Sequence, residues 1–419
     1  MADRMPLTPV LMVAFHFPPL AGSSGVQRTL RFVQHLPALG WRPLALSASP
    51  RAYERVSEDL LADIPDCAVV RRAFALDAAR HLAVAGHYFG WTAKPDRWVS
   101  WRFDAVRHGM QLVREFRPRV IWSTYPIATA HLIASAIHKK TGLPWVADFR
   151  DPMAQDGYPA DPAVWAMFKR IEEDAAQSAR FCVFTTPGAA RVYRDRYPAA
   201  AERIVVLENG YDECSFSGLP PPASVPVATR RRLLLLHSGI VYPSERDPAQ
   251  LFAALRGLRD AAMLDPADLL IRFRAAAHDE MLKALAARYG VGDFIEFSPA
   301  APYRAALAEM QAADALLVLQ AGNCNDQIPA KVYEYLRAGR PIIALTDPAG
   351  DTAGVLRQAG ILAMARLDSA QDIERALPVF LAAVRTGTAA TAAPAAVRAA
   401  SRMGRSAVLA GLLEQAAKG

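Results

Sequence analysis

Two carboxylates and a lysine lie close together in the segment DQIPAKVYEYLRAG (326–339). Pro329 suits the first turn of a helix, and Glu334 follows Lys331 by three positions, so both side chains share one helix face. Such a pair can bind a phosphate and the two hydroxyls of a ribose. Asp326 falls in the loop before this helix. The alternative is a surface Lys–Glu pair, which contributes less than ~1 kcal/mol.

The loop HSGIVYPSERDP (237–248) has residues that suit a diphosphate. Gly239 lets the backbone approach such a ligand closely, and Arg246 can neutralise its charge. An ordinary turn with a surface arginine is the alternative for this loop. The two segments together therefore indicate a phosphate-binding site in the second half of the chain.

A glycine- and serine-rich loop, FHFPPLAGSSGVQR (15–28), follows the first apolar run. Gly22 and Gly25 permit positive φ and close ligand approach. Ser23 and Ser24 can cap the next helix, whose N-terminus favours an anion. No GK[ST] follows and the pattern is not GxGxxG, so neither a Walker loop nor a dinucleotide fingerprint is present. A plain strand-to-helix turn is the alternative.

Charged and imidazole groups follow two other apolar runs. In VADFRDPM (146–153), Asp148 or Asp151 can form a structural ion pair with Arg150, because burying charge is costly unless it is paired. A substrate-facing cluster is the alternative, and the motif is not DXD, so Mg²⁺ or Mn²⁺ is not assigned. His131 lies one turn inside a predicted helix, either as a core or capping residue or as a hydrogen-bond donor to developing charge.

The elements that must position these residues alternate along the chain. Short apolar runs are typical of strands buried on both faces, and the amphipathic stretches between them are typical of helices. The strand-like runs cover 10–15, 43–48, 119–124, 144–149, 181–186, 203–207, 233–239, 269–275, 293–298, 315–320, 341–345 and 360–364. The helical patterns include 27–39, 101–116, 127–140 and 163–178. The alternation predicts an α/β fold with two doubly wound, Rossmann-like domains facing across a cleft, with ligands at the carboxyl ends of the strands.

A Pro- and Ser-rich break, SFSGLPPPASVPVA (216–229), separates the two halves. We expect an N-terminal domain over 1–215, a linker over 216–230 and a C-terminal domain over 231–395. Residues 396–419 follow an Ala- and Thr-rich break. Val408, Leu409, Leu412 and Leu413 recur there at helical spacing, which predicts a final helix.

Composition narrows the classes of partner. Lys+Arg number 48 and Asp+Glu 41, a net charge of +7 with a pI near 9.3, which suits an anionic substrate or an acidic membrane surface. The only dense basic run is Arg230-Arg231-Arg232, so nucleic acid is not expected. Four scattered cysteines favour a reducing compartment, and no apolar run reaches the ~18–20 residues of a spanning helix. We expect a cytoplasmic protein, soluble or peripheral on the inner face of the membrane.

An aromatic stretch, YFGWTAKPDRWVSWRF (88–103), alternates tryptophans with cations. It either packs as a long lid-like loop on the N-terminal domain or forms an acceptor surface at a membrane interface, where Trp and Arg are favoured. The residues leave both alternatives open.

Four segments, in order along the chain, resemble motifs of the family-four glycosyltransferases, retaining enzymes of the two-domain GT-B architecture. They are the glycine loop and helix over 17–41, the histidine helix with its Asp-Arg-Asp turn over 131–152, the loop over 237–248 and the E-x7-E donor segment over 326–345. The chain departs from the family at Ser23, where a second glycine is usual, at Arg246, where lysine is usual, and at Asp326, where glutamate is usual.

The resemblance implies a role for each matched residue. Gly22, Ser23, Ser24 and Gly25 would lie near the donor phosphates and the acceptor, and His131 would hydrogen-bond the transferred sugar. Gly239, Arg246 and Lys331 would hold the diphosphate, Asp326 would contact the sugar, and Glu334 would bind the ribose. The predicted catalytic set is His131, Asp148, Arg150, Asp151 and Asp326.

The implied activity is transfer of a sugar, with retention, from a nucleotide-diphosphate sugar to a saccharide or lipid-linked saccharide in cell-surface polysaccharide or glycolipid synthesis. The donor is a substrate, and no metal or other cofactor is expected. The family mechanism is a front-face displacement, and no carboxylate pair here is suited to a nucleophile plus an acid/base. The last helix would cross back to the N-terminal domain. The alternatives are another GT-B sugar-nucleotide enzyme, epimerase-like, or a non-catalytic binding subunit.

Overall fold

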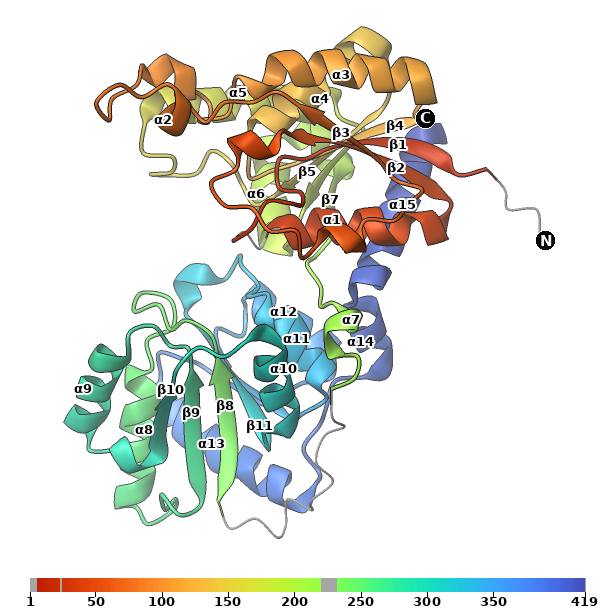
Figure 1. Cartoon of the computed structure of the whole chain (residues 1–419). Helices are drawn as coiled ribbons and strands as arrows, with labels where there is room; N and C mark the ends of the chain where they lie inside the picture. The colour runs from red at the N-terminus through yellow and green to blue at the C-terminus, as the bar shows by residue number, and fades with distance from the viewer. Residues whose placement is uncertain (1–5, 23–24, 220–231, 419) are drawn as a thin grey trace. The chain divides into compact units, whose positions relative to one another are not determined.

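The structure is a computed structural model that describes residues 6–22, 25–219 and 232–418. The chain forms two compact units (Figure 1). The N-terminal unit comprises residues 1–209 together with 402–419, and the C-terminal unit comprises residues 210–401. The break at 216–229 thus lies within the C-terminal unit, and its residues 220–229 are outside the described residues. Ser23 and Ser24 are also outside them.

The N-terminal unit is built on a parallel sheet of seven strands in the order β3-β2-β1-β4-β5-β6-β7. The strands are β1 (Thr8–Val13), β2 (Trp41–Ala48), β3 (Val69–Ala73), β4 (Val120–Thr124), β5 (Trp145–Arg150), β6 (Phe181–Phe184) and β7 (Ile204–Val206). The central strands are buried on both faces, which explains why they read in the sequence as unbroken apolar runs. The strand order reverses between β1 and β4.

Helices cover both faces of this sheet. They are α1 (Gly25–His35), α2 (Ala78–His81), α3 (Trp101–Phe116), α4 (Thr129–Thr141), α5 (Pro162–Ser178), α6 (Pro187–Arg196) and α15 (Arg402–Lys418). One core contains α3 and α4, and the other contains α1 and α15. Local sequence sets several ends: the Asp161 side chain caps α5, and Gly142 ends α4 in a left-handed conformation.

The last helix, α15, belongs to the N-terminal unit although it ends the chain. It lies beside α1 in Figure 1 and also packs against β4 and β5. Leu409 and Leu413 are fully buried in the core that includes Val33 and Trp122, whereas Val408 is 45% exposed. The apolar face of α15 is therefore narrower than the sequence spacing indicated, and alanines fill the rest of it.

The C-terminal unit repeats the same topology with six parallel strands in the order β10-β9-β8-β11-β12-β13. The strands are β8 (Leu233–Ser238), β9 (Leu269–Arg274), β10 (Ile295–Ser298), β11 (Ala315–Gln320), β12 (Ile342–Thr346) and β13 (Met364–Ala365). The helices are α7 (Glu213–Phe216), α8 (Ala249–Asp260), α9 (Asp279–Tyr289), α10 (Tyr303–Ala312), α11 (Lys331–Ala338), α12 (Asp351–Gln358), α13 (Ala370–Thr386) and α14 (Pro394–Ala399).

Both units therefore have the doubly wound, Rossmann-like order, and the predicted fold class is confirmed. In such sheets ligands bind outside the carboxyl ends of the strands where the strand order reverses. That point lies between β1 and β4 in one unit and between β8 and β11 in the other. Among the described residues, no helix combines the length and apolar character needed to cross a membrane.

Candidate functional site

The residues predicted to hold a diphosphate come together in the C-terminal unit. We call His237, Gly239, Arg246, Lys331 and Glu334 the Lys331 cluster. It lies where β8 ends and α11 begins, at the point at which the strand order reverses. The position is the one at which doubly wound sheets bind ligands.

Gly239 lies directly against the end of the Lys331 side chain. Its φ of +114° is a conformation that other residues rarely adopt. A Cβ atom at Gly239 would stand 3.1 Å from the Lys331 Nζ atom and 3.3 Å from Cε. The turn thus favours glycine, and a side chain at this position would also displace the end of Lys331.

His237 connects Lys331 to the sheet. Lys331 Nζ lies 3.0 Å from His237 Nε2, and His237 Nδ1 lies 3.0 Å from the Leu317 carbonyl oxygen of β11. Because a carbonyl oxygen can only accept, Nδ1 carries the hydrogen, and Nε2 of the neutral imidazole accepts from Lys331. Burial, reinforced by the Lys331 cation, holds the pKa of His237 well below its usual range, so the imidazole is neutral.

Two cations stand beside this neutral imidazole. Burial, and after it the Arg246 cation, lowers the pKa of Lys331 to about 7. Arg246 Nη1 donates to the Ile240 carbonyl oxygen at 2.7 Å, and the guanidinium lies 5.1 Å from the centroid of the Tyr242 ring. Its buried Nε has no hydrogen-bond partner among the residues that the structure describes. An anion placed here would relieve the repulsion and accept the remaining hydrogen bonds.

Glu334 and Asp326 occupy different surroundings. Glu334 is half-buried and accepts a hydrogen bond from the Tyr303 hydroxyl at 2.8 Å. Asp326 is exposed in the loop before α11. A carboxylate held at the edge of the cluster, as Glu334 is, can accept hydroxyl hydrogens from a ribose, and a ribose hydroxyl would compete with Tyr303 for it.

In the N-terminal unit, Asp148 pairs with Arg28 and not with Arg150. Arg28 Nε and Nη2 donate to the two Asp148 carboxylate oxygens at 2.8 and 3.1 Å. The Arg28 and Asp148 side chains are 1% and 0% exposed. Nη2 also donates to the Leu207 carbonyl oxygen at 2.9 Å. The structural ion pair, one of the two alternatives for this motif, is therefore present with a different partner, and Asp148 is too enclosed for the predicted catalytic contact.

Arg150, Gly25 and His16 meet at the carboxyl end of this sheet. A Cβ atom at Gly25 would overlap the His16 imidazole and stand 3.2 Å from Arg150 Nη1. Burial, helped by Arg150, lowers the pKa of His16 to about 4, so this imidazole is neutral at pH 7. Burial also lowers the pKa of Arg150 and raises the pKa of Asp151. Of the predicted catalytic set, Arg150 and Asp151 are thus at the ligand-binding end of the sheet.

His131 lies in the core, which is the first of the two alternatives stated for it. Its side chain is 0% exposed, its ring centroid is 4.6 Å from that of Phe149, and its Nδ1 lies 2.8 Å from the Ser123 hydroxyl oxygen. Burial lowers the pKa of His131 to about 3. The Trp145 and Phe149 rings of β5 pack against its ring, so the core-residue alternative fits this histidine.

A pocket of about 330 Å³ opens near His16 and Gly22 in the N-terminal unit. We call it the Trp98 pocket. Phe15, Tyr53 and Trp98 form its aromatic part, with ring centroids of Phe15 and Trp98 4.7 Å apart. Its other lining residues are His16, Leu20, Ala21, Gly22, Ala52, Glu54, Arg55 and Arg97. Aromatic faces bordered by charged and polar groups can bind a polar organic ligand.

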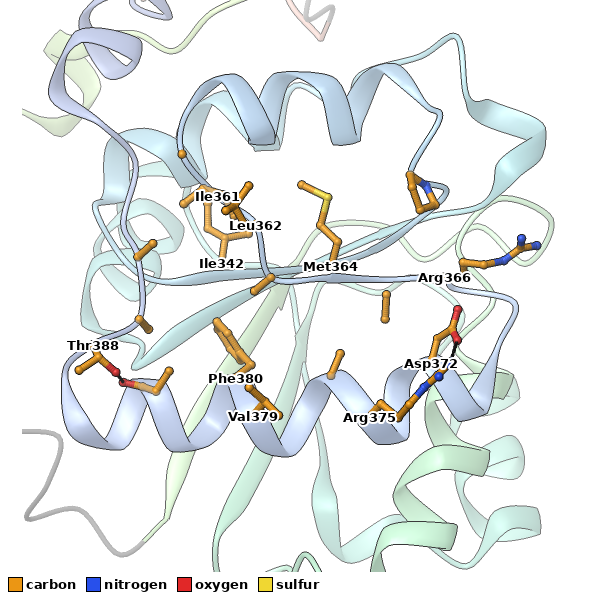
Figure 2. A pocket seen from close by; sticks show the side chains of 18 residues that line it. Ile342, Ile361, Leu362, Met364, Arg366, Asp372, Arg375, Val379, Phe380 and Thr388 are labelled. Atoms are coloured by element: carbon orange, nitrogen blue, oxygen red, sulfur yellow. Dashed lines mark hydrogen bonds and ion pairs between the residues drawn. The ribbon is translucent and has the colours of Figure 1, made fainter.

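Two hollows in the C-terminal unit differ in character. One, of about 630 Å³, lies between α13 and the segment leading into β13; Figure 2 shows its apolar side chains, among them Leu362, Met364 and Phe380. It contains none of the predicted site residues. The other, of about 800 Å³, is lined by Ile240 of the Gly239 loop and by the loops after β9 and β10. The second hollow is therefore next to the Lys331 cluster.

The described residues contain no group of three or more His, Cys, Asp or Glu side chains that could hold a metal ion. Sequence reasoning missed four residues that contact the predicted site residues. His237 ends the apolar run LLLLH, His16 follows the first run directly, Arg28 lies three positions after Gly25, and Tyr303 had no signal in the sequence.

Comparisons with known proteins agree with the two-unit fold. Residues 24–210 match the model of the glycosyl transferase 4-like domain. No curated protein matches the sequence. The fold is similar to that of sucrose-phosphate synthase from Thermosynechococcus elongatus, at 14% identity over 97% of this chain and 98% of that one, with a TM-score of 0.62.

Two further solved structures are similar. Anabaena Alr3699/HepE in complex with UDP and glucose has a TM-score of 0.60 at 11% identity, over 98% of this chain and 100% of that one. The lipopolysaccharide outer core galactosyltransferase WaaB has a TM-score of 0.59 at 12% identity, over 96% and 100%. These likenesses span both units. Residues 24–210 match the glycosyl transferase 4-like domain, and the chain as a whole has the GT-B fold of these glycosyltransferases.

Proposed function

We propose that the chain transfers a sugar from a nucleotide-diphosphate sugar to a hydroxyl acceptor, with retention, in the synthesis of a cell-surface polysaccharide or glycolipid. The Lys331 cluster carries this proposal. It places a neutral imidazole, a glycine backbone and two cations where a doubly wound sheet binds its ligand. This combination suits a diphosphate that leaves with the nucleotide.

The residues of the cluster act by position and charge. The diphosphate lies against Gly239, Lys331 and Arg246 neutralise it, and Glu334 accepts the ribose hydroxyls. When the bond between the sugar and the diphosphate oxygen breaks, the same cations stabilise the charge that develops on the leaving group. The acceptor oxygen bonds to the sugar on the same face, and its proton passes to the leaving diphosphate. No metal or cofactor takes part.

The acceptor binds in the N-terminal unit. The Trp98 pocket supports this because it offers aromatic faces and charged groups at the ligand-binding end of the sheet. His16 is neutral at pH 7 and can exchange hydrogen bonds with an acceptor hydroxyl. The hollow beside Ile240 in the other unit has room for the nucleoside of the donor.

A lipid-linked acceptor would place the enzyme at the inner face of the membrane. Phe89 and Trp91, in the aromatic stretch, are 75% and 76% exposed, and their rings stack with centroids 6.5 Å apart. Residues 78–95 contain no acidic side chain. Exposed aromatic rings and cations without acids suit an anionic bilayer surface. Vesicles of anionic and of zwitterionic lipid test this: wild type should sediment with the anionic ones, and Phe89→Ser/Trp91→Ser should not.

The activity is tested with a panel of UDP-, GDP-, dTDP- and CMP-sugars. Thermal shift identifies the donor, because a ligand at 100 times its dissociation constant adds ~2.7 kcal/mol to apparent stability. NMR of the product then gives the anomeric configuration, which should match that of the donor. Inversion would refute retention, interconversion of the donor sugar would favour the epimerase-like alternative, and binding without hydrolysis or transfer would favour a non-catalytic subunit.

A further inference from the structure

We propose that His237 is a positioning residue of the donor site, which holds the Lys331 ammonium group against Gly239 so that it meets the diphosphate. The inference rests on the proposed function, since it takes the Lys331 cluster as the place where the diphosphate binds. It adds a residue to which neither the motifs nor the comparisons assign a role.

The contacts of His237 leave its ring little freedom. The Nδ1 hydrogen is donated to Leu317 of β11, so the lone pair of Nε2 points to Lys331 and the tautomer is set. The adjacent Ser238 backbone N–H donates to the Tyr335 hydroxyl at 2.8 Å, which ties α11 to β8. The contact between Ser238 and Tyr335 thus positions α11, and the His237 imidazole positions the Lys331 ammonium group.

A purely apolar packing role does not explain a histidine here. His237 follows four leucines in β8 and is 0% exposed, a position where a fifth leucine would avoid burying two ring nitrogens. Without the Nε2 acceptor, the half-buried Lys331 ammonium would lose a hydrogen bond while still facing the Arg246 cation. Repulsion would then favour rotamers that carry it away from Gly239.

The protonation of Lys331 on diphosphate binding provides a measurement of this positioning role. Among the described residues, Lys331 is influenced by Arg246, by Glu334 of its own helix and by the neutral His237. With a pKa near 7, much of Lys331 is uncharged above neutral pH. A bound diphosphate favours the charged form, so Lys331 takes up a proton from solvent. His237 does not supply it, because burial holds its pKa well below the usual range and the imidazole is already neutral.

Two amide substitutions separate positioning from packing. His237→Gln places an amide oxygen near the position of Nε2 and keeps an acceptor for Lys331. His237→Asn places its amide near Nδ1, keeps the donor to Leu317 and removes that acceptor. Inorganic pyrophosphate is the probe, because it needs no choice of base, and UDP, GDP and dTDP are the second set. Binding is measured by calorimetry on the full chain.

We expect His237→Asn to weaken pyrophosphate binding by about tenfold, the effect of one hydrogen bond to a charged group, and His237→Gln to bind within about threefold of wild type. In the Lys331→Gln background, His237→Asn should add no further loss, because the residue acts through the lysine. An equal loss for Asn and Gln, or losses that add in the double variant, would overturn the inference.

Proton uptake gives an independent readout. Calorimetry in buffers of different ionisation enthalpy should show uptake on pyrophosphate binding, with a midpoint near pH 7 for wild type and His237→Gln. His237→Asn should shift the midpoint to lower pH, because the charged lysine loses an acceptor. An unshifted midpoint would overturn the positioning role. If wild type binds neither pyrophosphate nor any of the nucleoside diphosphates, the proposed function fails together with the inference; if it binds them and only the variants behave alike, the inference alone fails.

Discussion

Replacing Asp148 by asparagine tests whether this carboxylate is structural or catalytic. Arg28 is 1% exposed and keeps carbonyl contacts to Leu207 and Glu208 in the variant, but it loses its counter-charge. Removing one partner of a buried ion pair costs about 3–5 kcal/mol, and the lower end is expected because asparagine can still accept a hydrogen bond. For a unit of this size each kcal/mol lowers the melting temperature by about 2–4 °C, so we expect Asp148→Asn to lower it by roughly 6–12 °C.

The distribution of tryptophans allows the melting temperature of the N-terminal unit to be measured by itself. All seven tryptophans lie between Trp41 and Trp165, so tryptophan fluorescence follows the N-terminal unit alone. The control is Glu115→Gln, the same acid-to-amide change in an exposed pair with Arg71, whose side chains are 53% and 37% exposed. A surface pair contributes less than ~1 kcal/mol, so this variant should melt within about 4 °C of wild type.

The two alternatives for Asp148 give different results. If the pair is structural, the Asp148→Asn protein should unfold at a lower temperature than wild type. Its turnover, measured below that melting temperature, should stay within about tenfold of wild type. An Asp148→Asn protein that melts with wild type but has lost turnover would refute the reasoning and return Asp148 to the catalytic set.

Four further outcomes are expected. Glu334→Ala should raise the dissociation constant of the donor about 10- to 150-fold in calorimetry, since a charge-assisted hydrogen bond contributes ~1.5–3 kcal/mol; unchanged affinity would contradict the ribose contact. Arg246→Lys should keep part of the turnover and Arg246→Ala should lose most of it, unless another cation holds the diphosphate. Deleting residues 397–419 should lower both turnover and the fluorescence melting temperature, because Leu409 and its neighbours leave the N-terminal core; a truncated protein equal to full length in both would contradict this. The dissociation constant of UDP should rise up to tenfold per pH unit above about pH 7, because the binding form of Lys331 is the charged one and its pKa in the free protein is near 7; a constant value between pH 7 and 9 would contradict it.

The positions of most strands follow from the sequence alone. Strands buried on both faces must be apolar at every position, so runs such as 315–320 are visible in the sequence, and that run matches β11 residue for residue. The helix over 101–116 was also predicted with its bounds, because its apolar spacing is regular. β3 escaped notice because it pairs with β2 on one side only, is largely half-buried and contains two arginines, so its sequence has no apolar run.

The Lys331 cluster could be foreseen in part. Glycine and proline mark turns and helix starts wherever they occur. Gly239 and Arg246 lie in a loop, and Lys331 begins a helix, at positions that follow from the alternation of elements. Their neighbours could not be foreseen. His237 reads as the end of an apolar run, and only the pairing of β8 with β11 brings its ring to Leu317 on one side and Lys331 on the other.

Tertiary structure alone decided which charged groups pair and which face a ligand. Residue types and spacing determined that this chain alternates strands and helices and ends its strands with polar loops, because those patterns follow from local geometry and burial. Arg28 and Asp148 are 120 positions apart, and His131 differs from a surface histidine only in what packs over it. Such contacts depend on strand order and on which helix covers which face, and these arise when distant segments compete to bury their apolar surface.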